Sequence, residues 1–252
     1  MLRPRIIPCL LLSDGGLVKT VNFKNPKYVG DPLNVVKILN EKEVDELILM
    51  DINSSLNRKK IDFNLIEKIA SECRMPLCYG GGISELSDFQ RLINIGVEKV
   101  SVSTTLFKSL DILHQASELV GSQSVVVVLD VKKENGNYIV YQSNGAKSTC
   151  YDVVDFISRI NQGYIGEIVI NSIDRDGTMI GYDFDLLEHV YPHIKVPFTF
   201  LGGASDNLNI RQLFLKYRNV GAGVGSLFVF KGKFKAVLVN YPDRDEKLQI
   251  IN

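Results

Sequence analysis

The sequence has no tryptophan, only three histidines and four cysteines, and no excess of charge of either sign. Its 29 basic and 29 acidic residues balance, so the whole molecule has no field that would attract nucleic acid or an anionic membrane. No apolar run reaches the roughly 18–20 residues that a membrane-spanning helix needs. The cysteines lack CxxC spacing, and neither they nor the histidines form a metal-site or nucleophile pattern. We therefore expect a cytoplasmic protein without a metal or cofactor that acts on a small molecule.

The sequence repeats itself once, at an offset of 121 residues. The run ELILMD from Glu46 returns as EIVINS from Glu167, and the segment around Gly82 returns around Gly203. The segment STTLF likewise returns as VGSLF. A repeat at about half the chain length is too long for a solenoid, so it predicts a fold with two-fold internal symmetry.

Short β-rich runs alternate with helical patterns along the whole chain. Several runs are apolar on both faces, which is typical of parallel strands covered by helices. Eight such strands in two equivalent halves predict a single α/β domain over residues 1–252, a (β/α)8 TIM barrel with half-barrels of about 1–120 and 121–240. A doubly wound open sheet is the alternative, but it does not predict the repeat. The expected strands begin near Arg5, Glu46, Pro76, Lys99, Ser124, Glu167, Pro197 and Val220, and the helical patterns cover 32–43, 63–73, 86–96, 109–121, 151–163, 184–192 and 207–217.

Two connections are longer than a barrel requires. Residues 13–31 follow the first strand, and connections of this length are often lids. Residues 134–147 contain two Asn-Gly pairs around alternating apolar residues, which predicts a β-hairpin inserted after the fifth strand. Both connections would lie at the carboxyl ends of the strands, the face on which barrels of this kind carry their active sites.

Asp130 is the strongest catalytic candidate among single residues. It closes the apolar run VVVVLD, which places a carboxylate at the mouth of the fifth strand, where it would suit a general acid or base. The alternative is that it only caps the next connection. Asp176, in the segment SIDRDGT after the sixth strand, is either a second site residue or part of an ordinary Asp-Gly turn.

Two Gly-rich turns followed by hydroxyl side chains predict two anion sites. Glycine lets the backbone N–H groups approach an anion closely, and the hydroxyls donate further hydrogen bonds. The duplication favours a phosphorylated ligand with two anionic groups. Lys19, Asp176 and Gly177 are expected to join this ligand site. The first turn comprises Gly80, Gly81, Gly82, Ser103 and Thr104, and the second comprises Gly202, Gly203, Gly225 and Ser226.

Four charged residues of alternating sign stand immediately before or at the start of four strands: Arg5, Glu46, Lys99 and Glu167. They would be able to form a ring of salt bridges across the amino-terminal end of the barrel. Such a ring is consistent with a gate on a central passage, but charges also commonly flank strand starts. From these residues alone, the second interpretation is preferred.

Together these segments resemble the cyclase subunit of imidazole glycerol phosphate synthase, the HisF type, over about residues 1–240. RIIPCL, GGLVKTVNF, YGGGIS, GSQSVVVVLD, SIDRDGT and LGGA carry the resemblance. It implies a lyase barrel of the histidine pathway that receives ammonia from a separate glutaminase subunit docked on its amino-terminal face. It also implies that Arg5, Glu46, Lys99 and Glu167 form the ammonia gate. The resemblance therefore favours a gate over charges that only flank strand starts.

The chain departs from this family at the mouth of the first strand. Where the family has an Asp that acts as the acid/base partner of the Asp at strand 5, the run IPCLLL has Leu11. Leucine neither gives nor takes a proton, so one half of the paired carboxylates is missing. Ser103, Asn171 and Leu201 also stand where the family tends to have Asn, Thr and Ser.

A gate and glycine turns without the carboxylate pair resemble the paralogues associated with sugar amidation for bacterial surface polysaccharides. Our leading hypothesis is therefore a barrel that passes ammonia to a third amidotransferase protein that forms an acetamidino sugar. One alternative is a working cyclase in which Asp130 acts with Asp176 or with water. Another is a non-catalytic scaffold that only docks the glutaminase.

Overall fold

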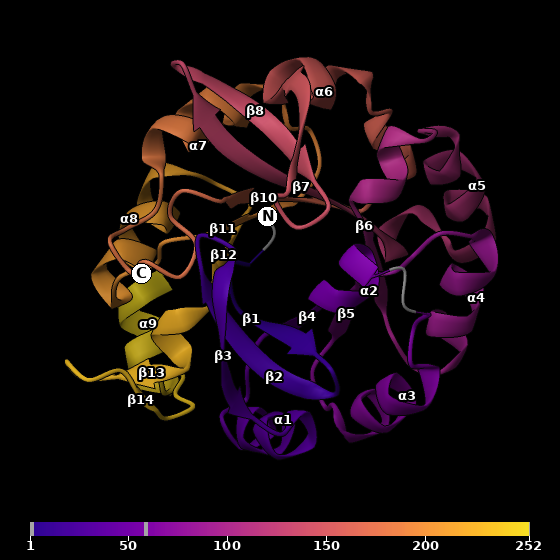
Figure 1. The fold of residues 1–252 in the computed structure, drawn as a ribbon. Coiled ribbons are helices and arrows are strands. Elements are labelled where there is room, and N and C mark those ends of the chain that lie inside the picture. Colours follow the sequence, from indigo (N-terminus) through magenta and orange to yellow (C-terminus); the bar gives the residue numbers. More distant parts are fainter. Residues whose placement is uncertain (1–2, 58–59, 252) are drawn as a thin grey trace.

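The computed structural model describes residues 3–57 and 60–251, which form a closed barrel of eight parallel strands ringed by helices (Figure 1). The barrel closes because β10 (Glu167–Ser172) pairs with both β11 (Phe198–Leu201) and β7 (Val125–Glu134). This closure confirms the (β/α)8 barrel and excludes the open sheet. The other barrel strands are β12 (Val220–Val224), β1 (Arg5–Ser13), β4 (Leu47–Asp51), β5 (Leu77–Gly80) and β6 (Lys99–Val102).

Alternate residues of each barrel strand point inward, because successive side chains of a strand lie on opposite faces. On β1 the inward residues are Arg5, Ile7, Cys9 and Leu11, in order from the amino-terminal end to the mouth. The interior thus has three levels: charged side chains, an apolar middle and a cavity. The apolar middle consists of Ile7, Cys9, Ile48, Cys78, Val126, Val128, Val169 and Leu201, packed against Met50.

The helices cover the outside of the barrel and bury their apolar faces against it. All seven expected helical patterns are helices: α1 (Pro32–Glu41), α3 (Phe63–Glu72), α4 (Leu86–Asn94), α5 (Asp111–Val120), α6 (Val153–Arg159), α7 (Phe184–Val190) and α8 (Asn207–Lys216). Two helices were not predicted, α2 (Ile52–Asn57) and α9 (Arg244–Ile251). The start of α9 has reciprocal hydrogen bonds between Asp243 and Glu246, a capping pattern that is readable in the sequence.

The two halves of the barrel match in local detail at the 121-residue offset. Asp62 caps α3 by accepting a hydrogen bond from Leu65 N, and Asp183 caps α7 by accepting one from Leu186 N. The Gly81–Gly82 pair has φ values of 115° and 74°, and the corresponding pair in the second half has 101° and 97°. These left-handed conformations favour glycine, so the repeated glycines shape the same turn twice.

Antiparallel strands extend two of the barrel strands beyond the mouth. The connection after β1 folds into β2 (Gly16–Val21) and β3 (Lys24–Gly30), and β2 pairs with the end of β1. Beyond β7, the strands β8 (Asn137–Gln142) and β9 (Lys147–Asp152) form an antiparallel meander with it. Figure 1 shows both extensions over the same end of the barrel. The connection of residues 13–31 is therefore an ordered hairpin.

The carboxyl-terminal segment runs from the β2–β3 hairpin, where Lys27 contacts Phe230, to the amino-terminal end of the barrel. It contains the short strands β13 (Phe230–Lys231) and β14 (Ala236–Val237) and then α9. Tyr241 is buried, and its hydroxyl donates to Ile6 O at 2.9 Å and lies 3.2 Å from Asp45 Oδ2. Among the helices of residues 3–57 and 60–251, none has the length and apolar character needed to cross a membrane.

Candidate functional site

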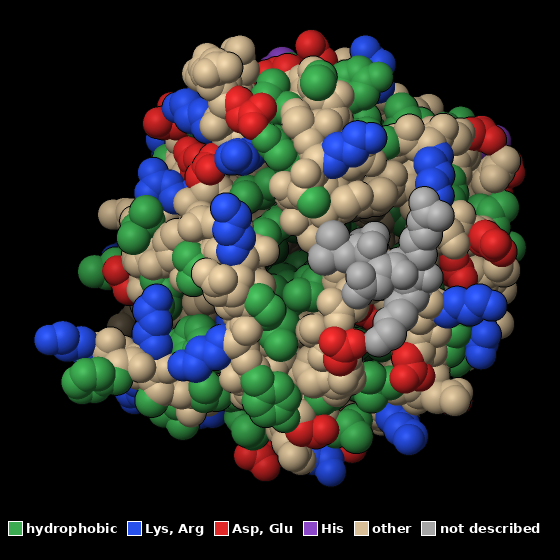
Figure 2. Space-filling model, viewed as in Figure 1, with side chains coloured by type: hydrophobic (Ala, Val, Ile, Leu, Met, Phe, Trp, Pro, Cys, Tyr) green, Lys and Arg blue, Asp and Glu red, His purple; other side chains and the backbone are tan. Residues whose placement is uncertain are grey.

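A large cavity opens at the carboxyl ends of the barrel strands, with a volume of about 1050 Å³. Figure 2 shows this face of the molecule hollowed near its middle, with hydrophobic side chains inside the hollow. The cavity brings together most of the predicted ligand-site residues: Leu11, Lys19, Gly81, Gly82, Ser103, Thr104, Asp130, Asp176 and Gly225. Residues from both halves of the sequence therefore face one space.

Asp130 lies near the floor of the cavity, on β7. Its Oδ1 accepts a hydrogen bond from Asn171 Nδ2 at 3.0 Å. Burial raises the pKa of Asp130 to about 7, an effect that the hydrogen bond from Asn171 opposes and the charge of Asp176 reinforces. A carboxyl group of this kind changes protonation near neutral pH, as a general acid or base requires.

Lys19 and Asp176 form a second polar group beside Asp130. Lys19 is buried on β2, and its Nζ donates to Cys9 O. Burial lowers the pKa of Lys19 and raises that of Asp176, while their opposite charges act against both shifts. Thr20 Oγ1 lies 3.4 Å from Asp176 Oδ2, so the loop after β10 and the β2–β3 hairpin meet at this carboxylate.

The rest of the cavity floor is apolar. Leu11, Met50, Val128 and Leu201 line it together with Cys9. Burial raises the pKa of the Cys9 thiol to about 11, so this cysteine is protonated at neutral pH. Among the described residues at the carboxyl end of β1, none supplies a carboxylate opposite Asp130, because the inward position is Leu11.

The first glycine turn faces the cavity. Gly81, Gly82, Ser103 and Thr104 all line it, from the ends of β5 and β6. Thr104 Oγ1 accepts a hydrogen bond from Ser143 N at 3.1 Å, which brings the β8–β9 tip against this turn. The predicted residues of the first anion site are thus adjacent in space.

The second glycine turn is arranged differently. Gly202, Gly203 and Ser226 are buried and do not belong to the cavity wall, which in this half includes Gly225. The backbone of the loop after β10 covers the turn, since Gly181 N donates to Gly203 O at 2.8 Å. Gly177, in the same loop, packs against the backbone of Thr20 outside the cavity wall.

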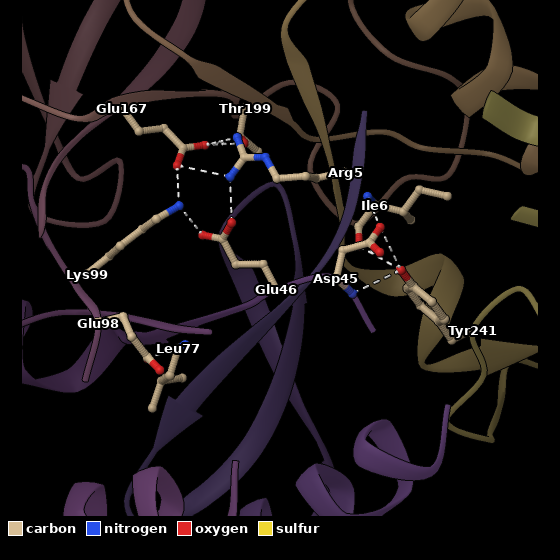
Figure 3. Close-up of polar contacts among 10 residues, drawn as sticks. All are labelled: Arg5, Ile6, Asp45, Glu46, Leu77, Glu98, Lys99, Glu167, Thr199 and Tyr241. Atoms are coloured by element: carbon tan, nitrogen blue, oxygen red, sulfur yellow. Dashed lines mark hydrogen bonds and ion pairs between the residues drawn. The ribbon is translucent and has the colours of Figure 1, made fainter. Parts of the chain in front are cut away.

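Four charged side chains form a closed ring at the opposite end of the barrel, which we call the ionic ring (Figure 3). Glu46 accepts from Arg5 Nη1 at 2.5 Å and from Lys99 Nζ at 2.7 Å. Glu167 accepts from Arg5 Nη2 and Lys99 Nζ, both at 2.8 Å, and from Thr199 Oγ1 at 2.5 Å. All four side chains point toward one another across the interior.

The two carboxylates of the ionic ring are buried, and its two cations are partly exposed. Glu46 and Glu167 are each 3% exposed. Burial alone would raise the pKa of Glu167, but the charges of Arg5 and Lys99 lower it to about 2. The same contacts raise the pKa values of Arg5 and Lys99 above their usual range in spite of burial. Arg5, Lys99 and Glu167 therefore remain ionised at neutral pH.

Several cavity residues were not identified from the sequence. Asp51 closes the strand LILMD as Asp130 closes VVVVLD, so the same signal was available. Phe23, at the tip of the β2–β3 hairpin, and Arg91, on α4, had no such signal. Within residues 3–57 and 60–251, no group of three or more His, Cys, Asp or Glu side chains is placed to hold a metal ion.

Comparisons with known proteins agree on one family. The model of the histidine biosynthesis protein family matches residues 5–235. A Vibrio vulnificus protein, provisionally named imidazole glycerol phosphate synthase subunit hisF3, is 52% identical over 98% of this chain and 96% of its own length. A Pseudomonas aeruginosa protein, provisionally named subunit hisF2, is 45% identical over 96% of this chain and 97% of its own length. Subunit HisF of Saccharolobus solfataricus is 36% identical over 85% of each chain.

Proposed function

We propose a function from one premise: this chain belongs to the histidine biosynthesis protein family, as a HisF-type imidazole glycerol phosphate synthase subunit. On that premise, we propose that its barrel conducts ammonia. A separate glutaminase would dock on the amino-terminal face and release ammonia at the ionic ring. The ammonia would cross the apolar middle and reach the cavity at the other end. The observation that carries this proposal is the complete ionic ring below a cavity in which Leu11 replaces a carboxylate.

The interior of the barrel supports passage of a small neutral molecule. Between the ionic ring and the polar residues of the cavity, the inward side chains are apolar or uncharged and include Ile7, Val126, Val169 and Ser101. Such a lining does not favour the ammonium ion, because desolvating a charge there costs far more than desolvating neutral ammonia. The ring itself spans the axis, so passage requires one of its side chains to move. Lys99 is the best candidate, since a flexible unbranched chain carries its charge.

The cavity supports an acceptor reaction other than ring closure. Asp130 lies at a floor that is otherwise apolar and includes Leu11 and Leu201, so no carboxylate stands at the mouth of β1 to pair with it. We propose that the ammonia is used for nitrogen transfer in the synthesis of an acetamidino surface sugar, with a third amidotransferase protein receiving it. The segments IPCLLL, GGLVKT and FKNPKYVGDP, which resemble the paralogues of that system, support this assignment.

Two assays test the proposal. Adding this chain to the glutaminase of its complex should increase glutamate release from glutamine. The chain supplied with ammonium and the ribulosyl aminoimidazole carboxamide nucleotide of the histidine pathway should form no imidazole glycerol phosphate. Robust turnover in the second assay would contradict the sugar-amidation role.

One observation favours a second candidate, a genuine histidine-pathway cyclase. Asp130 has a pKa of about 7 and lies close enough to Asp176 to feel its charge, so one carboxyl group could serve as base while the other or water serves as acid. Loss of one acid/base partner typically costs about 10²- to 10⁴-fold in rate. A Leu11→Asp variant should therefore gain cyclase activity by about that factor if the remaining pocket is competent.

Asp130→Asn separates both enzymes from a non-catalytic scaffold. A chain that only docks the glutaminase keeps its full effect on glutamate release and on nitrogen transfer after this change. A chain whose cavity takes part in the reaction keeps its effect on glutamate release and loses its effect on nitrogen transfer. The two readouts together therefore identify which function the cavity serves.

A further inference from the structure

The cavity wall includes residues of α3 and α4, and this part of the wall carries three cations. We define the outer lobe as the cavity wall formed by Lys60, Phe63, Arg91 and Lys108 beside the first glycine turn. Lys60, Arg91 and Lys108 are all exposed. Across residues 3–57 and 60–251, none of the three has an ion-pair partner.

Three carboxylates also line this side of the cavity, but hydrogen bonds from the chain itself engage them. Asp51 accepts three hydrogen bonds from the first turn of α2. Asp88 accepts two from backbone N–H groups just before α4, and Glu85 accepts one from Ser87. These bonds hold the three carboxylates to backbone and hydroxyl groups near them in sequence, and in the described part of the chain none of them forms an ion pair with Lys60, Arg91 or Lys108.

Arg91 is held in place by a neighbouring ring. Its guanidinium carbon lies 3.8 Å from the centre of the Phe63 ring. Stacking fixes the guanidinium plane, which lowers the entropy that the side chain would lose on binding an anion. A fixed guanidinium donates two parallel hydrogen bonds to a phosphate group.

The internal repeat supplies a control for this charge pattern. The positions 121 residues after Lys60, Arg91 and Lys108 hold Gly181, Gln212 and Val229. None of these three carries a charge, although the backbone turn beside them is the same. The cations are therefore not a requirement of the fold. They distinguish one anion turn from its copy.

We propose that the outer lobe and the first glycine turn together bind a diphosphate group. One phosphoryl group would lie on the backbone and hydroxyls of Gly81, Gly82, Ser103 and Thr104. The second would lie in the outer lobe, where Arg91 and Lys108 contact it. A diphosphate ester, with its organic group toward Asp130, fills the lobe and the central cavity together. This inference rests on the proposed function only in taking the cavity as the ligand site.

Calorimetric titration of the full chain with inorganic pyrophosphate and inorganic phosphate, at equal ionic strength, tests the proposal. Pyrophosphate should bind about tenfold more tightly than phosphate or better, because it adds charge-assisted hydrogen bonds in the outer lobe. Arg91→Gln and Lys108→Gln should each weaken pyrophosphate binding about tenfold and phosphate binding much less. Arg211→Gln, which removes an exposed charge from α8 outside the cavity wall, is the matched control and should change neither.

Equal affinity for the two anions, or equal effects of Arg91→Gln and Arg211→Gln, would overturn the diphosphate assignment. The absence of any pyrophosphate binding to the unaltered chain would overturn it as well. Activation of the glutaminase by the unaltered chain needs no pyrophosphate. That assay therefore reports on the proposed function separately. A failure of the proposed function can thus be distinguished from a failure of the diphosphate assignment.

Discussion

At the scale of single residues, position along a strand decides what each inward side chain does. The same alternation that brings Arg5 into the ionic ring brings Leu11 to the cavity six residues later. A polar residue at a strand end is therefore a candidate site residue, and Asp130, which lines the cavity, was predicted this way. Its chemical setting was not readable, because the pKa of Asp130 depends on burial and then on Asn171 and Asp176, which arrive from another strand and the loop after it.

Asp130→Asn should change how the stability of the chain depends on pH. The folded state holds the proton of Asp130 up to a pKa of about 7, against an ordinary value of 3.8, so this stabilisation is present at low pH and is lost as pH rises toward 7. The amide cannot ionise and still accepts the hydrogen bond from Asn171. Relative to the unaltered chain, the free energy of unfolding of the variant should therefore rise by roughly 1–2 kcal/mol between pH 5 and pH 8. This is less than the full pKa shift implies, because the cavity admits water.

Urea denaturation at pH 5, 6, 7 and 8 measures this difference in the free energy of unfolding. The difference should grow between pH 5 and pH 7 and level off above it. A difference that stays constant across the series would mean that Asp130 ionises at an ordinary pKa.

At the scale of elements, the barrel strands and their helices were predictable and the walls of the cavity were not. Buried parallel strands are apolar runs with clear ends, and amphipathic helices have a clear period. The cavity walls depend instead on which elements meet above the barrel. Ser143 contacts Thr104 only because β8 and β9 extend β7 over the mouth, and Arg91 faces the cavity only because α4 packs beside Phe63.

The contact between the β2–β3 hairpin and the loop after β10 has a glycine at its centre. Gly177 has a φ of 72°, and a side chain there would overlap the backbone oxygen of Thr20. Asn22 N donates to Asp176 O at 2.9 Å in the same contact. Gly177→Ala should therefore separate the hairpin from the loop and cost about 1–3 kcal/mol. Amide hydrogen exchange of residues 16–30 should become faster.

Gly121→Ala provides the control for backbone strain. Gly121 also has a positive φ, 85°, but a side chain there would meet nothing within 4 Å. In this variant the free energy of unfolding should fall only by the conformational cost of the positive φ, about 1 kcal/mol. Amide hydrogen exchange in residues 16–30 should stay unchanged. Equal exchange rates in the two variants would show that the hairpin is not held by this contact.

At the scale of the whole molecule, the ionic ring joins the two halves of the barrel. Arg5, Glu46 and Lys99 belong to the first half and Glu167 to the second. The charges cancel, and each carboxylate contacts both cations. The four residues by themselves gave no reason to prefer a ring over charges that merely flank strand starts, and only the family resemblance favoured the ring. The choice depends on how closely the strand starts approach across the axis.

Removing one charge from the ionic ring should lower the free energy of unfolding far more than removing one cation together with one anion. Glu167→Gln leaves Arg5 and Lys99 with a single carboxylate in a buried site, and breaking a buried pair in this way costs about 3–5 kcal/mol. The Glu167→Gln, Lys99→Met double variant restores neutrality, so it should lose less than the sum of the single changes. Glu118→Gln, at an exposed carboxylate on α5, should lose less than about 0.5 kcal/mol.

The free energies of unfolding of Glu167→Gln, Lys99→Met, the double variant and the unaltered chain complete the cycle. Additive losses would mean that Lys99 and Glu167 do not interact across the interior, which would remove the basis for a gate. Because the pKa of Glu167 is about 2, its contribution is present above its ordinary pKa of 4.5 and is lost as pH falls toward 2. The loss caused by Glu167→Gln should accordingly be constant from pH 6 to pH 8. Under the proposed function, ammonia would therefore have to pass Glu167 by movement of a side chain and not by loss of the charge of this carboxylate.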